Sequence, residues 1–170
     1  VWVQADLYLC RGQLERARVS LDEMVELLAT LEQDSQWQEL QVWRRSVLAV
    51  YLSSIGDYAL ARAEYGALLA FLQKCDLVLW PWLPEIGSGF WQMHTHAGLG
   101  LVARLMGEYD TAQLHLIASI RLSEEMGERR FKAHRQRDLA MVQSLRGDFD
   151  EALRTAQIAL ALSHSFGDRI

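Results

Sequence analysis

Proline is scarce in this chain of 170 residues, which contains only Pro81 and Pro84. Proline is the residue that most strongly interrupts a helix, because it lacks the backbone donor and clashes with the preceding turn. Outside residues 81–84 the chain therefore permits helix formation almost without a break. Sandwiches and barrels need turn residues every few positions, so the scarcity of proline disfavours an all-β fold.

Long apolar runs and a cysteine framework are also lacking. The uninterrupted apolar stretches are a few residues long, far below the ~20 residues of a membrane-spanning helix. A signal peptide begins with a basic segment followed by an apolar run, and the first residues of this chain do not have this pattern. Cys10 and Cys75 stand far apart, and we expect two small buried thiols in a cytoplasmic protein. The chain starts at Val1 without Met, and we interpret it as a fragment of a longer protein.

The charge and the apolar content exclude further classes of protein. The chain is 51% hydrophobic and 23% charged, which is typical of a globular protein and excludes a disordered one. The net charge of −5 gives no overall attraction to nucleic acid or to an anionic membrane. We therefore expect no membrane partner and no direct contact with nucleic acid.

A short pattern occurs four times along the chain: Gly, a polar residue, an aromatic residue or Leu, two variable residues, and Ala. The four segments begin at Gly12, Gly56, Gly107 and Gly147, with spacings of 44, 51 and 40. Glycine ends a helix easily, because it adopts the left-handed conformation. The polar residue can cap the next helix, the aromatic residue or Leu can pack back into the turn, and Ala allows two helices to approach closely.

A second small residue stands seven positions before each glycine, at Ala5, Ala49, Gly100 and Ala140. Seven residues are two helical turns, so this residue faces the same way as the turn. Apolar residues at spacings of three and four flank each segment. We predict a single domain, 1–170, of eight helices in four hairpins, at about 1–33, 37–75, 90–126 and 130–166. An irregular linker, 76–89, separates the second and third hairpins.

The turn glycine, the aromatic residue and the alanine, as in Gly147, Phe149 and Ala152, resemble the tetratricopeptide repeat (TPR) family. The resemblance covers nearly the whole chain. It implies an all-α fold, a right-handed α-α superhelix of about four TPR-like hairpins, that binds a protein or peptide without catalysis. These repeats exceed the family period of ~34 residues and lack its terminal proline. Their length is similar to the helical-repeat region of large LuxR-type transcription regulators and related bacterial signalling proteins, which implies a regulatory role.

Motifs that carry enzyme chemistry are not found. The sequence contains no phosphate loop, dinucleotide fingerprint, zinc-protease motif, CxxC pair or nucleophile elbow. His94 and His96 are two positions apart, so on a helix they point in different directions and cannot hold one metal ion together. We expect no catalytic residue, no cofactor and no metal.

The resemblance implies that the first helix of each hairpin lines a concave binding face. Aligning the hairpins on their turn glycines places the following residues there: Trp2, Asp6, Trp43, Ser46, Val50, His94, Arg104, His134, Arg137 and Met141. Arg104 and Arg137 can each bind a carboxylate through two hydrogen bonds. The Lys and Asn set with which some family members hold a chaperone's C-terminal carboxylate is not reproduced, so we do not predict a co-chaperone.

Two clusters leave alternatives open. The basic run 129–137 is either a solvated helix face paired with nearby glutamates or a docking patch for an acidic peptide. The aromatic cluster is either packing between hairpins or an exposed patch for self-association as a homodimer. Its members are Trp80, Trp82, Phe90 and Trp91.

Three functions remain in view. The first is binding of a protein or peptide partner, which can be another part of the parent protein. The second is sensing of a small-molecule effector near residues 80–91, with an effect on oligomerisation. The third is a purely structural self-association module.

Overall fold

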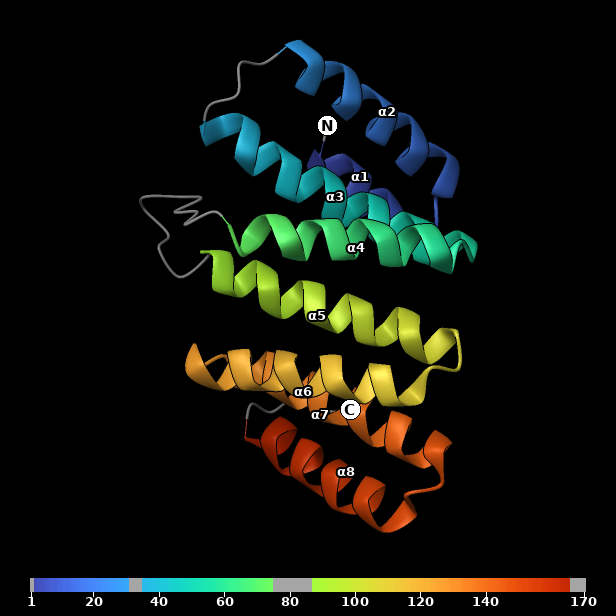
Figure 1. Ribbon diagram of the computed structural model, residues 1–170, viewed down its shortest axis with the longest axis vertical. Coiled ribbons are helices and arrows are strands. Elements are labelled where there is room, and N and C mark those ends of the chain that lie inside the picture. Colours follow the sequence, from blue (N-terminus) through green and yellow to red (C-terminus); the bar gives the residue numbers. More distant parts are fainter. Residues whose placement is uncertain (1, 31–34, 75–86, 166–170) are drawn as a thin grey trace. The chain divides into compact units, whose positions relative to one another are not determined.

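The described part of the chain consists mainly of α-helices, and a short turn connects the two helices of each hairpin (Figure 1). The computed structural model describes residues 2–30, 35–74 and 87–165. In chain order the helices are α1 (Trp2–Cys10), α2 (Leu14–Thr30), α3 (Ser35–Ile55), α4 (Tyr58–Leu72), α5 (Ser88–Leu105), α6 (Tyr109–Glu125), α7 (Arg129–Arg146) and α8 (Phe149–His164). The predicted all-α fold of four hairpins is confirmed, with α1 packed on α2, α3 on α4, α5 on α6 and α7 on α8.

The helices form two compact units, one within residues 1–84 and one within residues 85–170. Most of the predicted linker, 76–86, lies outside the described residues. Its last part differs from the prediction, because α5 begins at Ser88 and so includes Gly89. The expectation of one domain over the whole chain stays a prediction.

In the first unit, α3 packs against α1, α2 and α4. The core here is formed by Ala5 of α1, Leu21 and Met24 of α2, and Val47 of α3. Trp43 of α3 packs against the edge of this cluster. Helices α3 and α4 are also joined by an ion pair of 2.9 Å between Arg45 Nη1 and Glu64 Oε2.

In the second unit, α6 packs against both α5 and α7, and α8 packs against α7 (Figure 1). The core cluster contains residues from all of the first three helices: Ala103, Ala112, Leu116, Ile120, Leu139 and Val142. Tyr109 packs against this cluster from the start of α6. The apolar contacts are therefore continuous through two successive hairpins.

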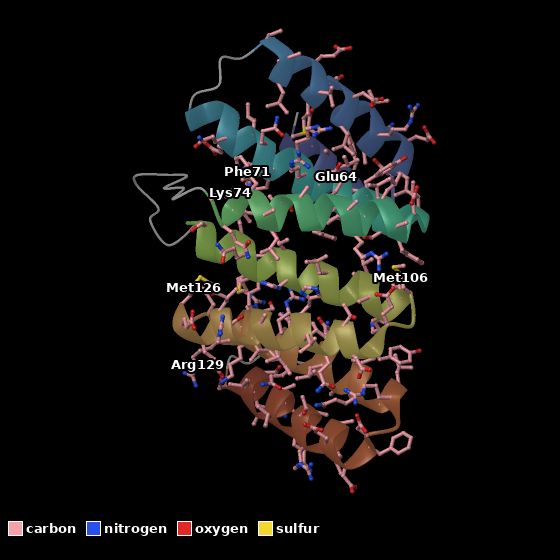
Figure 2. All side chains as sticks on the ribbon, in the orientation of Figure 1. Glu64, Phe71, Lys74, Met106, Met126 and Arg129 are labelled. Atoms are coloured by element: carbon pink, nitrogen blue, oxygen red, sulfur yellow. The ribbon has the colours of Figure 1, made fainter. Side chains whose placement is uncertain are left out.

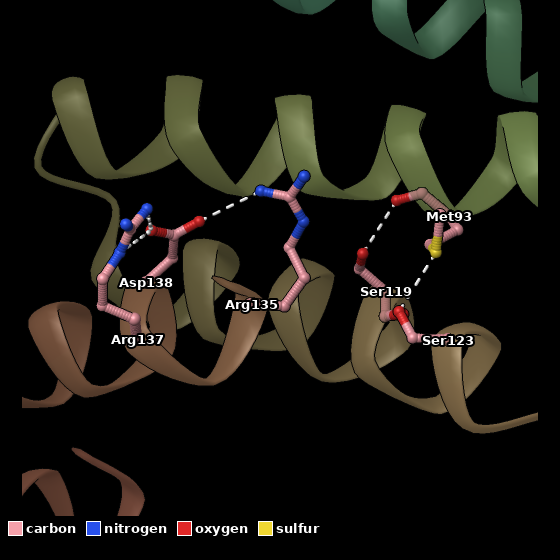
Figure 3. A network of polar contacts seen from close by, with 6 residues as sticks. All are labelled: Met93, Ser119, Ser123, Arg135, Arg137 and Asp138. Atoms are coloured by element: carbon pink, nitrogen blue, oxygen red, sulfur yellow. Dashed lines mark hydrogen bonds and ion pairs between the residues drawn. The ribbon is translucent and has the colours of Figure 1, made fainter. Parts of the chain in front are cut away.

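A buried polar network connects α5 and α6 (Figure 3). The hydroxyl of Ser119 in α6 donates to the backbone carbonyl of Met93 in α5, at 2.8 Å. The hydroxyl of Ser123 lies 3.1 Å from Met93 Sδ and 2.8 Å from the carbonyl of Ser119. These buried hydroxyls have partners, as buried polar groups require.

The four turn glycines behave as predicted, since Gly12, Gly56, Gly107 and Gly147 all have φ between 67° and 92°. A fifth such glycine, Gly127 between α6 and α7, was not singled out from the sequence. It lies in the connection between two hairpins rather than inside one, so it has no counterpart in the four aligned segments.

The predicted capping role holds only in part. Asp57 Oδ1 accepts a hydrogen bond from the backbone N–H of Leu60, at 3.3 Å, and so caps α4. The side chains of Glu108 and Asp148 make no cap bond. Asp148 instead accepts from Arg146 Nε at 3.2 Å, because the turn brings this guanidinium next to its carboxylate.

Two further expectations about single residues are wrong. Cys10 is exposed rather than buried, because it is the last residue of α1, beside the turn; Cys75 lies outside the described residues. Phe149 does not pack back into its turn and is 69% exposed. Its counterpart Tyr109 packs against a core that includes residues of α7, whereas α8 contacts no described helix other than α7.

The small residues of the repeat lie where the two helices of a hairpin meet. Ala5, Ala49 and Ala112 are fully buried. A Cβ added at Gly100 would stand 2.9 Å from Leu116 Cγ and 3.3 Å from the carbonyl oxygen of Ala112. Only a residue without a side chain allows α5 and α6 to approach this closely.

Substitution of this glycine tests the close approach. Gly100→Ala forces a methyl group into the buried Leu116, and overpacking outweighs the gain in helix propensity, so we expect a loss of about 1 kcal/mol in the free energy of unfolding. Gly66→Ala is the matched control, because a Cβ at this helical position meets nothing within 4 Å; it should gain up to ~1 kcal/mol. Urea denaturation followed by circular dichroism measures both, and changes of the same sign would contradict the packing argument.

Candidate functional site

One side of α7 is exposed along its whole length. The exposed residues stand three or four positions apart: Arg130, His134, Arg137, Met141 and Leu145. The opposite side carries buried residues, among them Ala133, Leu139 and Val142. We call the exposed stripe the α7 face. It is basic toward the start of the helix and apolar toward its end.

Helix α5 lies beside α7 and continues the apolar part of this surface. Leu101 and Leu105 are exposed, and they stand six and two positions before their turn glycine, as Met141 and Leu145 do in α7. Arg104 is half-buried next to Leu105. The two first helices of this unit therefore present four exposed apolar side chains near basic ones.

The basic run at the start of α7 is largely paired. Arg129 is the first residue both of the basic run and of helix α7 (Figure 2). Lys132 Nζ lies 2.7 Å from Glu124 Oε1, which is one of the predicted pairings. Arg135 and Arg137 both bind Asp138, each at 3.1 Å (Figure 3). One carboxylate thus compensates two guanidinium groups, and this part of the α7 face keeps a net positive charge.

His94 lies among aromatic rings. Its ring centroid is 4.5 Å from that of Phe90 and 4.7 Å from that of Phe131. Burial and the nearby Arg135 lower the pKa of His94 to about 4. Its Nε2 is buried and has no hydrogen-bond partner in the described part of the chain. A neutral imidazole is the form that this environment favours.

His96 points to a different neighbour, as the two-residue spacing predicts. Its Nδ1 lies 3.0 Å from Nδ1 of His115 in α6. One ring must donate and the other accept, so the contact requires that at least one of the two be neutral. Burial lowers the pKa of both residues, and the two neighbours His115 and Arg121 lower that of His96 further. Among the described residues, no three His, Cys, Asp or Glu side chains come together as a metal site would require.

Of the other predicted groove residues, those in α1 and α3 belong to the first unit. The side chains of Trp2 and Asp6 lie outside the described part of the structure. In α3, Trp43 packs against the core of the first unit, Ser46 is partly buried, and Val50 is exposed. The structure thus brings His134, Arg137 and Met141 together on α7 and leaves the role of the other residues untested.

Of the predicted aromatic cluster, the structure describes only Phe90 and Trp91. Trp80 and Trp82 lie outside the described residues. Trp91 is buried, and Phe90 packs edge-on against Trp91 and Phe131, with ring centroids 5.9 and 5.8 Å apart. This placement favours internal packing of Phe90 and Trp91 over an exposed association patch.

Sequence reasoning included Arg130 only in the basic run 129–137, and it missed Leu105 and Leu145 on this surface. The spacing of three and four residues that places Met141 on the α7 face also places Arg130 and Leu145 there. Their signal was therefore present in the sequence, but the alignment selected positions 3 to 13 residues before the turn glycine, whereas Leu145 stands 2 and Arg130 stands 17 residues before Gly147.

The family model described as tetratricopeptide repeat matches residues 1–23 and 133–157. These stretches contain α1 with the first half of α2, and most of α7 with the first half of α8. The chain is similar to a tetratricopeptide repeat over these two stretches, and its helical hairpins are TPR-like. Stacked helical repeats of this kind present extended surfaces that bind other proteins.

Other comparisons are distant. The crystal structure of BtubC (BKLC) from P. vanneervenii is 16% identical, with a TM-score of 0.45, over 98% of this chain and 79% of that chain. No curated protein matches the sequence. Within the described residues, none of the TPR-like helices combines the length and the apolar character of a membrane span.

The buried histidines make the stability of the TPR-like fold depend on pH. The folded state holds the pKa of His94 at about 4, below the 6.5 of an unfolded chain, so the unfolded state binds more protons between these values. Stability is therefore full above pH 6.5 and falls as the pH is lowered toward 4. Because the group is partly solvated, we expect a loss on the order of 1–2 kcal/mol at pH 5.

Urea denaturation at pH 7 and pH 5 measures this loss. His94→Gln removes the titrating group and should reduce the difference between the two pH values. His134→Gln, on the exposed α7 face, is the matched control and should leave it unchanged. If the wild type and His94→Gln lost the same free energy of unfolding between pH 7 and pH 5, His94 would not be the group responsible for the pH dependence.

Proposed function

We propose that this chain is a non-catalytic module that binds an acidic peptide segment of a partner protein through the α7 face and the adjoining residues of α5. The observation that carries the proposal is the exposed stripe from Arg130 to Leu145, basic at one end and apolar at the other. An exposed apolar patch beside charged residues is typical of a protein contact site.

The chemistry of the stripe defines the ligand. Met141, Leu145, Leu101 and Leu105 offer apolar contacts to hydrophobic side chains. Arg137 offers a planar guanidinium that binds carboxylates through two hydrogen bonds. We therefore expect a ligand with aspartate or glutamate residues near one end and large apolar residues near the other.

The ion pairs of α7 prepare the surface for binding. Asp138 holds Arg137 through contacts of its Oδ1 with Nε and Nη2, at 3.4 and 3.1 Å. A side chain that is already ordered loses less conformational entropy when a ligand binds. Because Asp138 also binds Arg135, the pair of arginines retains one positive charge with which a ligand carboxylate can interact.

We place this module in a multidomain bacterial signalling or transcription regulator in the cytoplasm. The support is the similarity of the long repeats to the helical-repeat region of LuxR-type regulators and the lack of a disulfide pattern in the sequence. In such a setting the bound segment can belong to a partner or to another part of the parent protein.

Peptides selected from a random display library on the intact chain test this function. We expect the selected peptides to be enriched in acidic and apolar residues. Arg104→Ala combined with Arg137→Ala should weaken binding of one such peptide by about tenfold, since charge-assisted hydrogen bonds are lost. Isothermal titration calorimetry measures the affinity, and circular dichroism checks that the helices are retained.

Arg121→Ala is the matched control. Arg121 is exposed on α6 and pairs with Glu125 at 3.5 Å, so it resembles Arg137 in chemistry but lies off the α7 face. Its removal should leave the affinity unchanged. An unchanged affinity in the double variant, or an equal loss in the control, would count against the α7 face as the binding surface.

A further inference from the structure

Helix α2 carries an acidic stripe on its exposed side. Val19, Glu23 and Glu26 are exposed, and their spacing of four and three residues places them on one side of the helix. The buried residues of α2 lie on the opposite side. Arg16 precedes the stripe by one turn, but its guanidinium lies over the ring of Tyr8 in α1, 5.8 Å from the ring centre. We call Val19, Glu23 and Glu26 the α2 stripe.

The two carboxylates of the α2 stripe are not compensated by the cation beside them. Arg18 lies 3.4 Å from Glu15 Oε2 and 3.5 Å from Asp22 Oδ2, so it is engaged with the other two carboxylates of the helix. Within the described part of the chain, Glu23 and Glu26 form no ion pair. The stripe therefore presents two negative charges next to an apolar side chain.

The α7 face presents complementary side chains in the same spacing. From the end of α7 toward its start, Met141, Arg137 and His134 follow at intervals of four and three residues. The α2 stripe has the same intervals from its start toward its end. An antiparallel contact between the two helices therefore places the valine on Met141, one glutamate on Arg137 and the other beside His134. Arginine binds a carboxylate through two hydrogen bonds, and a histidine N–H can donate another.

Neither surface is used for the stacking of successive hairpins. Aligned on the turn glycines, the α2 stripe corresponds in α6 to Leu114, Ala118 and Arg121. Helix α6 packs against both α5 and α7, and yet its Leu114 and Arg121 remain exposed. In the same way Leu101 and Leu105 of α5 remain exposed beside α7. Both stripes therefore lie on sides of their helices that neighbouring repeats leave open.

The acidic stripe is specific to one of the four second helices. At the same three positions, α4 and α8 carry the following residues: Ala63, Ala67 and Ala70 in α4, and Arg154, Ile158 and Ala161 in α8. Among the second helices, α2 alone has carboxylates at these positions. The complement of the α7 face is thus found at one place in the repeat.

We propose that the α7 face binds the α2 stripe of a second copy of this chain, in a head-to-tail contact of two antiparallel helices. The inference rests on the binding surface of the proposed function and names one occupant for it. A head-to-tail contact leaves one α2 stripe and one α7 face free at the two ends of the assembly, so further copies can add. It also covers the surface that binds an acidic segment of a partner, so the two ligands compete.

The association should be weak and sensitive to salt. One pair of helices buries less surface than the ~1,200 Å² of a stable complex, so we expect a dissociation constant on the order of 0.1 mM. The charged groups are exposed, and salt screens their attraction. In sedimentation equilibrium of the intact chain, the average mass should rise with concentration in low salt and should fall in ~0.5 M salt.

Two variants separate the two surfaces. Glu23→Arg combined with Glu26→Arg reverses the charge of the α2 stripe, and Arg137→Gln combined with Met141→Gln removes the central contacts of the α7 face. Each variant alone should stay monomeric where the wild type associates. An equimolar mixture should form a dimer and nothing larger, because it contains one unaltered α2 stripe and one unaltered α7 face for each pair of chains.

Glu125→Arg combined with Glu151→Arg is the matched control. Both glutamates are exposed and lie off the two surfaces, and their replacement changes the net charge as the α2 variant does. The control should associate as the wild type does. Circular dichroism of all variants should show that the helices are retained, because every altered position is exposed.

Four results would overturn the proposal: a wild type that stays monomeric up to ~1 mM, a mixture of the two variants that does not associate, a control that loses association, and a wild type that stops at a dimer, as a two-fold contact would. None of them touches the proposed function, which fails only if selected peptides bind without Arg104 and Arg137. A monomeric wild type that binds such peptides would therefore overturn the second copy as the occupant and leave the α7 face as a binding surface.

Discussion

The close approach of two helices at a small residue is the contact on which the second unit depends. At Gly100 the backbone of α5 comes so near to α6 that a single Cβ would collide with Leu116. Leu116 belongs to the cluster that connects α5, α6 and α7. Leu116 therefore packs on the backbone at Gly100 on one side and on apolar residues of α7 on the other. This packing determines how α7, and with it the α7 face, is oriented.

Much of the fold could be predicted from the sequence, because its main signals are local. The positive φ of Gly147 and the burial of Ala152 follow from steric rules that need no tertiary information. The cap at Asp148 could not be predicted in the same way. Its carboxylate has two competing partners, a backbone N–H and the guanidinium of Arg146, and the outcome depends on where the preceding helix ends.

The candidate site was predictable only as a list of positions. Helical spacing identifies His134, Arg137 and Met141 as neighbours on one side of α7, and the structure shows all three exposed. The environment of His94 depends on Phe131 and Arg135 of another helix, so no local pattern shows that its ring is enclosed and uncharged. For the same reason the sequence reveals Phe149 as part of a repeat but not its exposure, which depends on whether a further helix covers α8.

The hydroxyl of Ser119 has a consequence for how the α5–α6 hairpin can move. Apolar contacts are not directional, so they specify the axial register of two helices less strictly than a hydrogen bond does. A slide of one turn, ~5.4 Å, would separate Ser119 from the carbonyl of Met93 and leave a buried donor without an acceptor, which is costly. This hydrogen bond therefore fixes the axial register of the two helices. We therefore expect the α5–α6 hairpin to change its tilt toward its neighbours as one piece.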